Sequence, residues 1–293
     1  MNVLFGVMSF KTISGSSVYV YELARELTSQ GHHVVVKTLE PGGIMTTKAR
    51  EKGIEVREIK EDLGDFKPDV MHLNDFWPTQ FLLSRYPKHP AIVSVHSELP
   101  MGNPMVSERV KKYICIRESI QRKVVQEDLV SQDRTVFIPN GFDTSRFNTN
   151  YEMPHHPRKK ILFVGTINVL RKEALAHTFQ IAEDNDWDVQ VIGQRLDRFL
   201  DGYPNWIHVD PEVGGVWNIE DYVKACDLTA GILLGRTTIE GWLCSKPGII
   251  FDIDLNARVT DWNVHDPPDD VMKYDAKNVV KQLLEVYNEA MVE

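Results

Sequence analysis

The sequence has little cysteine, no excess of positive charge and no long apolar run, and each lack excludes a class of protein. Three cysteines in 293 residues are too few and too widely spaced for a disulfide framework or a structural zinc site. The net charge of -9 argues against general attraction to nucleic acid or to an anionic membrane. No window approaches the roughly 18 consecutive apolar residues that a membrane span requires. Short repeats and low-complexity tracts are also missing.

The same features predict the compartment. Cys115, Cys226 and Cys244 lie in apolar surroundings, so we expect buried, reduced thiols in a cytoplasmic protein. The N-terminal stretch MNVLFGVMSF has neither a basic region before it nor a small-residue cleavage site after it. It therefore predicts a first strand and not a signal peptide.

The composition is that of an ordinary globular protein, with 42% apolar and 26% charged residues. A chain of 293 residues favours two domains over one. Apolar, β-branched runs alternate with segments of helical period, which is typical of parallel sheets covered by helices. The first strand, NVLFGVM, is followed by a Ser/Gly loop, a helix that ends at Gly31, and a second strand, HHVVVKTL.

This pattern stops and restarts near the middle of the chain. After Phe147 the segment NTNYEMPHHPRKK has no periodicity, two prolines and clustered charge, as in an interdomain linker. KILFVG then begins a new alternation that continues to the final helix. We predict two α/β domains, residues 1–152 and 153–293, each a doubly wound, Rossmann-like sheet.

Polar residues follow several strands of the first domain. In open parallel sheets ligands bind at the carboxyl ends of the strands. Gly15 and Ser16 begin the first helix, whose free N–H groups suit an anion. His96 ends a later strand and could bond a hydroxyl or phosphate or accept a proton, although local satisfaction by the backbone is the alternative. The other candidates at this edge are His72, Asn74, Asp75 and Glu98.

The corresponding positions of the second domain carry cations. Gly165 and Thr166 follow its first strand, and Arg171 and Lys172 come soon after; two cations there suit a diphosphate, or form a solvated charge pair. Later, the segment GRTTIEG places Glu240 on the first turns of a helix, where a carboxylate can accept ribose hydroxyls. The remaining donor-side candidates are Arg236, Thr237 and Thr238.

In order along the chain, the segments GHHVVV, PDVMHLND, SVHSEL, IPNGFDTSRF, FVGTINVLRK and GRTTIEGWLCSKPGIIFD resemble the family 4 glycosyltransferases of the GT-B fold. The resemblance implies two Rossmann-like domains facing a central cleft, with the acceptor bound by residues 1–152 and a nucleotide sugar by residues 153–293. IPNGFDTSRF, from residue 138 to 147, is its most specific piece and would mark the passage between the domains.

The resemblance also implies roles for single residues. Gly15 would lie near the donor phosphates or the acceptor, and His96 beside the reacting sugar. Arg171 or Lys172 resembles the family's diphosphate-binding lysine, and the spacing from Gly165 favours Arg171. Glu240 resembles the second of the family's paired glutamates, near the ribose. His96, Glu240, Arg171 and Lys172 are the predicted catalytic residues.

Two departures from the family pattern stand in the second domain. Thr166 occupies the place of an arginine after Gly165, and Ile232 that of the first glutamate. Arg236 could supply the lost cation. These departures motivate one alternative function, a non-catalytic nucleotide-sugar binding protein.

The main prediction is a retaining glycosyltransferase that uses a UDP- or GDP-sugar without a metal or other cofactor. Asp252 and Asp254 resemble a metal dyad, but they end a strand. The acceptor stays open among a glycan, a lipid-linked group, a small molecule and DNA with hydroxymethylated pyrimidines. The stretch Arg109–Lys123, with six basic residues and one acid, motivates the anionic acceptors, although a solvated helix face is the alternative.

Overall fold

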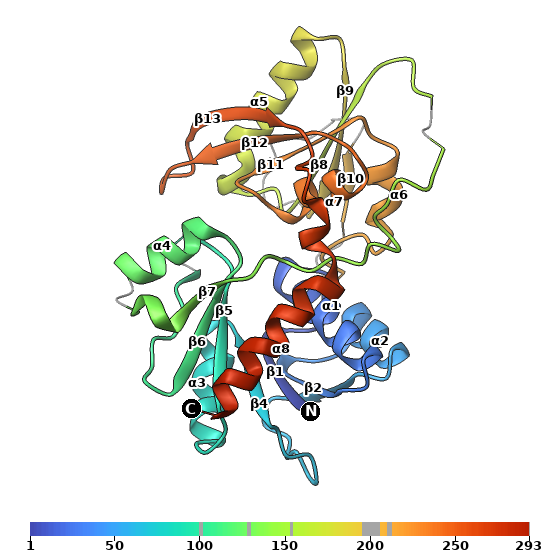
Figure 1. The fold of residues 1–293 in the computed structure, drawn as a ribbon. Helices are drawn as coiled ribbons and strands as arrows, with labels where there is room; N and C mark the ends of the chain where they lie inside the picture. Colours follow the sequence, from blue (N-terminus) through green and yellow to red (C-terminus); the bar gives the residue numbers. More distant parts are fainter. Residues whose placement is uncertain (100–101, 128–129, 153–154, 195–205, 210–212, 293) are drawn as a thin grey trace. The chain divides into compact units, whose positions relative to one another are not determined.

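The computed structural model describes residues 1–99, 102–127, 130–152, 155–194, 206–209 and 213–292. The chain forms two compact units (Figure 1). Unit 1 consists of Met1–Gly141 and Lys273–Glu293, and unit 2 of Phe142–Met272. Each contains one sheet of mainly parallel strands with helices, so the predicted α/β class with two Rossmann-like sheets is confirmed.

The sheet of unit 1 has the strand order β3-β2-β1-β4-β5-β6-β7, and every neighbouring pair is parallel. Its middle strands are buried apolar runs because helices cover both faces. The elements are β1 (Asn2–Ser9), α1 (Gly15–Ser29), β2 (His33–Glu40), α2 (Gly43–Glu51), β3 (Glu55–Glu58), β4 (Val70–Asn74), α3 (Phe76–Arg85), β5 (Ala91–Val95), β6 (Val110–Cys115), α4 (Glu118–Gln126), β7 (Thr135–Phe137) and α8 (Ala276–Val292).

Helix α1 ends where the sequence predicts. Gly31 has φ +84, and its N–H bonds the carbonyl of Thr28, while the N–H of His32 bonds that of Leu27. Only glycine adopts this left-handed conformation without strain, so Gly31 closes the helix and turns the chain into β2.

Helix α8 packs on unit 1, although it follows unit 2 in the chain. It contacts α1 and the strands β4, β5 and β6, which it crosses in Figure 1. Right-handed crossovers place α1 and α2 over the β1–β3 half of one sheet face, and α3 on the opposite face. The β4–β6 half of the first face therefore lacks a helix until α8 buries its apolar stripe, which includes Val279, Leu283 and Tyr287, against it.

The sheet of unit 2 has the order β10-β9-β8-β11-β12-β13, and its last strand is antiparallel. In strand order its first five positions repeat those of unit 1. The elements are β8 (Lys160–Val164), α5 (Val169–Asp184), β9 (Asp188–Gly193), β10 (Trp206–His208), α6 (Ile219–Lys224), β11 (Leu228–Ile232), α7 (Arg236–Leu243), β12 (Gly248–Ile253) and β13 (Val259–His265).

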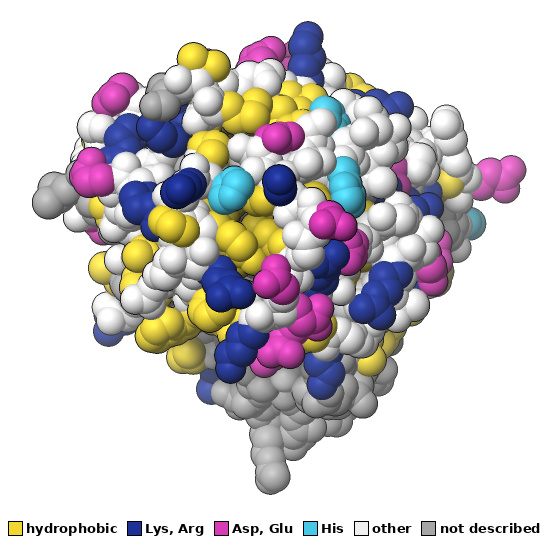
Figure 2. Space-filling view, turned by 90° about the horizontal axis from the view of Figure 1, so that it is seen from below, with side chains coloured by type: hydrophobic (Ala, Val, Ile, Leu, Met, Phe, Trp, Pro, Cys, Tyr) yellow, Lys and Arg dark blue, Asp and Glu magenta, His cyan; other side chains and the backbone are white. Residues whose placement is uncertain are grey.

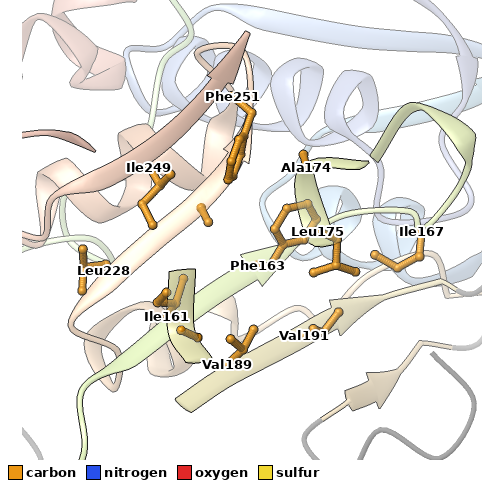
Figure 3. Close-up of a cluster of buried hydrophobic side chains, with 12 residues drawn as sticks. Ile161, Phe163, Ile167, Ala174, Leu175, Val189, Val191, Leu228, Ile249 and Phe251 are labelled. Carbon is orange, nitrogen blue, oxygen red and sulfur yellow. The ribbon is translucent and has the colours of Figure 1, made fainter. Parts of the chain in front are cut away.

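The core of unit 2 lies between its sheet and α5 (Figure 3). Strand residues such as Phe163, Val191 and Phe251 pack against Ala174 and Leu175 of the helix. This cluster fixes α5 on the sheet and thereby the loop that joins β8 to the helix.

The unit boundaries differ from the sequence prediction. The prediction places the division after residue 152 and assigns α8 to the second domain, whereas the chain divides at Gly141 and α8 packs on unit 1. In the segment taken for a linker, Tyr151 donates to the carbonyl of Cys244 at 3.0 Å and His156 bonds that of Ala225 at 2.8 Å. These contacts belong to unit 2. A hydrophobic period shows that a helix buries one face, but not against which sheet.

Three other features complete the fold. All three cysteines are buried thiols, as predicted. In the described part of the chain, no helix combines the length and apolar character needed to cross a membrane. On the face drawn in Figure 2, basic and acidic side chains are interspersed among apolar and uncharged groups.

Candidate active site

Asn74 and His96 meet at the carboxyl edge of the unit 1 sheet. Asn74 is the last residue of β4, and His96 follows β5, the neighbouring parallel strand. His96 Nε2 lies 2.9 Å from Asn74 Oδ1. Asn74 Nδ2 donates to the carbonyl of Gly6 at 3.2 Å, which orients the amide with its oxygen toward the histidine.

This contact assigns the tautomer of His96. An amide oxygen only accepts, so Nε2 carries the proton and Nδ1 keeps its lone pair. Burial, with a smaller contribution from the Arg117 charge, lowers the pKa of His96 to about 4. The ring is therefore neutral at pH 7, and its partly exposed side chain offers a hydrogen-bond acceptor rather than a positive charge.

His72 lies in the interior. Its Nδ1 is 2.7 Å from Tyr287 Oη on α8, and its Nε2 is 2.6 Å from Ser94 Oγ on β5. Ser94 Oγ also lies 2.8 Å from Tyr19 Oη, and burial, together with the charge of His96, lowers the pKa of His72 to about 3. The side chain is fully buried, so it joins α8 to the sheet instead of offering an accessible acceptor-side group.

The other acidic candidates of unit 1, Asp75 and Glu98, are both partly exposed and differ in their hydrogen-bond partners. Asp75 has φ +64, and its Oδ2 accepts from the N–H of Met8 at 2.8 Å; burial raises its pKa, and this hydrogen bond opposes the rise. Glu98 bonds both Arg117 and Ser119. Burial alone would raise the pKa of Glu98, but the bonds from Arg117 and Ser119 outweigh it and lower the pKa. Glu98 therefore fixes Arg117 near His96.

Gly15 and Ser16 begin α1 behind a capping box. Ser14 Oγ accepts from the N–H of Ser17 at 3.3 Å, and Ser17 Oγ accepts from the N–H of Ser14 at 2.8 Å. A Cβ added at Gly15 would meet no atom within 4 Å. The first turn of α1 is thus open on the Gly15 side, as an anion at this helix end would require.

In unit 2, Gly165 allows a close approach of three chain segments. Its φ is +151, and a Cβ there would lie 2.7 Å from Nε of Arg171. On the neighbouring strand, a Cβ at Gly193 would lie 1.7 Å from the Gly165 carbonyl oxygen. Larger residues at these positions would displace the loop after β8.

The two cations after this loop have different surroundings. Arg171 is partly buried, and its Nη1 donates to the carbonyl of Thr166 at 3.3 Å. Burial lowers the pKa of Arg171, but a guanidinium keeps its charge at pH 7. Lys172 is exposed on the first turn of α5. Arg171 is therefore fixed against the loop, whereas Lys172 projects outward.

Arg236 and Glu240 form an ion pair on α7. Arg236 Nη2 donates to Glu240 Oε1 at 3.3 Å, and the guanidinium carbon lies 4.2 Å from the centroid of the Phe142 ring. Burial raises the pKa of Glu240, while Arg236 and then Arg146 oppose the rise. Arg236 Nη1 is buried with no hydrogen-bond partner among the described residues. The pair therefore has unused hydrogen-bonding capacity.

The two threonines beside this ion pair differ in their exposure to solvent. Thr238 is buried, and its Cγ2 would lie 2.6 Å from a Cβ at Gly248, so it packs between α7 and β12. Thr237 is partly exposed. Ile232, which stands in place of the expected glutamate, ends β11, and Leu233 follows with φ +53.

Phe142 and Arg146 also contribute to this site, although the sequence pattern does not identify them. Both lie in IPNGFDTSRF: Phe142 supports Arg236, and Arg146 bonds the carboxylate of Glu220 and influences the pKa of Glu240. Asp143 accepts from the N–H and hydroxyl of Ser145, which shapes the turn. The motif indicated that this region is important, but not that the Phe142 ring packs against the guanidinium of Arg236.

The basic stretch Arg109–Lys123 is largely engaged within unit 1. Arg109 donates to carbonyls of α3 and its C-cap, Lys112 to that of Asp133, and Arg117 to Glu98. As for metals, no group of three or more His, Cys, Asp or Glu side chains in the described ranges could hold an ion. Asp254 accepts the N–H groups of Asn256 and Arg258 and closes a turn.

Comparison with known proteins shows a likeness to one family over the first half of the chain. The model of the family described as Glycosyltransferase Family 4 matches residues 13–146, from the loop before α1 to the end of IPNGFDTSR. The predicted resemblance to family 4 glycosyltransferases is thereby confirmed. No curated protein matches the chain by sequence.

Solved structures extend the likeness to the whole chain. A glycosyltransferase from Rickettsia africae has a TM-score of 0.70 at 13% identity, over 99% of this chain and 98% of that one. AviGT4, a glycosyltransferase involved in avilamycin A biosynthesis, has a TM-score of 0.61 at 13% identity, over 99% and 98%. A UDP-GlcNAc 2-epimerase from Neisseria meningitidis, bound to UDP-GlcNAc, has a TM-score of 0.55 at 11% identity, over 99% and 94%. At such identities the likeness shows the fold, which is the GT-B fold of these glycosyltransferases.

Proposed function

We propose that the protein is a retaining glycosyltransferase that moves a sugar from a UDP- or GDP-sugar to a hydroxyl acceptor. The observation that carries this proposal is the set of cations and one buried carboxylate that follow strands β8 and β11 of unit 2. The fold alone would not select transfer, because an epimerase is among the structures with a similar fold. The family match favours transfer.

In this proposal unit 2 binds the donor. Arg171, Lys172 and Arg236 oppose the charge that develops on the departing diphosphate, a role that needs no metal ion. Glu240 accepts hydroxyls of the ribose, and Arg236 opposes the rise that burial causes in the pKa of this carboxyl group. Gly165 and Thr166 admit the phosphates close to the backbone.

Unit 1 binds the acceptor and receives the reacting sugar. Departure of the diphosphate leaves an oxocarbenium-like sugar, and no residue is assigned as a nucleophile. His96 accepts a hydrogen bond from a sugar hydroxyl through Nδ1, because Asn74 occupies Nε2. The N–H groups at Gly15 and Ser16 face the phosphates or the acceptor. Three buried thiols are consistent with a cytoplasmic location.

The test is a panel of UDP- and GDP-sugars measured by thermal shift and by release of the nucleoside diphosphate. A donor that binds only the folded protein raises its melting temperature. We expect Glu240→Ala and Lys172→Ala to lose the shift or the turnover. The exposed helix residues Glu285 and Lys281 provide matched controls, Glu285→Ala and Lys281→Ala. Full activity of both site variants would overturn the proposal.

Two alternatives have their own discriminating results. Thr166 and Ile232, in place of the family's arginine and glutamate, favour a non-catalytic nucleotide-sugar binding protein. It would show calorimetric binding with no release of diphosphate from any donor. Transfer to hydroxymethylated pyrimidines in DNA would instead require salt-dependent binding of duplex DNA. The engagement of Arg109, Lys112 and Arg117 within unit 1 disfavours it.

A further inference from the structure

Two aromatic side chains begin α3 and face solvent. Trp77 is 62% exposed and Phe76 is 44% exposed, with their ring centroids 5.5 Å apart in an edge-to-face arrangement. We propose that this pair, Phe76 and Trp77, is a stacking platform for a saccharide acceptor. The inference rests on the proposed function and names the chemical class of its acceptor.

Packing of the fold does not account for the pair. The buried side of α3 is formed by Pro78, Thr79, Leu82 and Leu83, whereas Phe76 and Trp77 occupy the two positions before it. Aromatic surface in water is unfavourable by roughly 25 cal/mol per Å² relative to its burial. Trp77 is also far more exposed than Trp242 (7%), a tryptophan that packs inside unit 2. A bound ligand would remove this exposed surface from water.

The pair lies at the sheet edge that carries the candidate acceptor groups. Asn74 ends β4, Asp75 follows, and Phe76 opens the helix. Trp77 is two residues from Asp75, so their Cα atoms are at most about 7 Å apart. His96 contacts Asn74 directly. The aromatic surface and these polar groups therefore belong to one small region of unit 1.

The polar groups of this region accept hydrogen bonds. His96 offers Nδ1, and the Asp75 carboxylate, which accepts one bond from Met8, is partly exposed. A ligand that matches them presents several hydroxyl donors beside an apolar face. A pyranose ring does so, since its C–H groups carry partial positive charge and suit the negative face of an aromatic ring. Recognition of a saccharide thus uses both features of the site.

Charge disfavours the competing ligands. Residues 68–84, which include β4 and most of α3, contain no lysine or arginine. A lipid headgroup or nucleic-acid phosphate placed against the pair would meet the Asp75 carboxylate, and Arg117, the cation near His96, is already paired with Glu98. An aromatic anchor in a membrane surface normally has basic neighbours. The local composition therefore fits a neutral, hydroxyl-rich ligand.

The experiment measures binding to an array of immobilised mono- and oligosaccharides in the presence of UDP. It compares the wild type with Trp77→Ala, Trp77→Phe and the control Trp262→Ala, which removes another exposed tryptophan, on β13 of unit 2. We expect the wild type to bind at least one saccharide. Trp77→Ala should weaken that binding about ten-fold or more, Trp77→Phe less, and Trp262→Ala not at all. Unchanged melting temperatures without ligand establish that the variants fold.

Three results would overturn the inference: no saccharide bound by the wild type, equal binding by Trp77→Ala, or equal loss in Trp262→Ala. Binding to vesicles of equal parts phosphatidylcholine and phosphatidylglycerol is measured in parallel. Vesicle binding that depends on Trp77 would show that the aromatic pair binds a membrane surface and not a saccharide, and would also overturn the inference. The donor panel separates the two proposals. If a nucleotide sugar raises the melting temperature of the wild type but no saccharide binding depends on Trp77, only the stacking platform of Phe76 and Trp77 is overturned. Trp77-dependent saccharide binding without any donor response overturns only the transferase.

Discussion

The two units share one sheet plan but carry opposite chemistry at the carboxyl ends of their strands. In unit 1, Asp75 and His96 present hydrogen-bond acceptors, and the His96 ring, held by Asn74, is neutral at pH 7. In unit 2, Arg171 and Arg236 present cations around one buried carboxylate. The scaffold fixes where functional residues stand, and the residues after each strand decide which ligand they suit.

The units also differ in how the last part of the sheet is covered. In unit 1, α8 covers β4–β6. In unit 2, β13 ends the sheet as an antiparallel edge. Trp262 (40%) stays exposed beside the core residue Phe251, and Val264 (52%) stays exposed opposite Ile249. Four predictions test this comparison, from the largest expected effect to the smallest.

The largest effect is expected from glycines at strand contacts. Gly193→Ala would place a Cβ 1.7 Å from the backbone oxygen of Gly165, so the backbone of the loop after β8 would have to shift, and we expect a loss of more than about 4 kcal/mol of unfolding free energy. In unit 1, Gly6→Ala would meet side chains instead of backbone, Leu82 at 2.6 Å and Leu73 at 3.0 Å, and should cost about 1–3 kcal/mol. Urea unfolding measures both, and equal losses would contradict the contrast.

The next effect concerns the link between α8 and the unit 1 sheet. Tyr287→Phe leaves His72 Nδ1 buried without a partner, so the free energy of unfolding should fall by about 1–3 kcal/mol. The comparison in unit 2 is Tyr151→Phe, which removes one bond to the carbonyl of Cys244 and should cost about 0.5–1.5 kcal/mol. If Tyr287→Phe is as stable as the wild type, the packing of α8 on the sheet does not depend on the hydrogen bond between Tyr287 and His72.

His72 and His96 of unit 1 and Glu240 of unit 2 should contribute to the pH dependence of stability with opposite signs. The folded pKa values of His72 (about 3) and His96 (about 4) lie below the ordinary 6.5, so the unfolded chain binds more protons as pH falls from 6.5. Each histidine then lowers stability by up to about 1.4 kcal/mol per pH unit down to its folded pKa. Glu240 acts in reverse, because its raised pKa lets the folded state take up a proton first.

The measurement is urea unfolding of the wild type and of His72→Gln at about pH 7 and pH 5. The variant should lose less stability on acidification than the wild type, whatever its stability at pH 7. Equal pH dependence of the two proteins would contradict a low folded pKa for His72.

The smallest effect is expected from the exposed part of the basic stretch. Arg122 lies 3.9 Å from Glu118 one turn away on α4, and both side chains are exposed. Arg122→Ala should change the free energy of unfolding by less than about 0.5 kcal/mol. A clearly larger loss in urea unfolding would indicate a structural role for this pair.

The sequence determined the fold class, the alternation of strands and helices, the turn at Gly31 and the strand ends that carry polar residues, because these depend on local periodicity and on glycine and proline chemistry. It missed β3 and β13, which are partly exposed edge strands with charged or polar residues and so lack a strong apolar signal.

Only the tertiary structure decided that α8 covers unit 1, that His72 is an interior link, that Asn74 fixes the tautomer of His96, and that Phe142 supports Arg236. Each of these joins residues that are separated in the chain. An apolar stripe or a polar side chain shows that it needs a partner, but which partner it finds depends on how the sheets and helices pack, and that is a property of the whole fold.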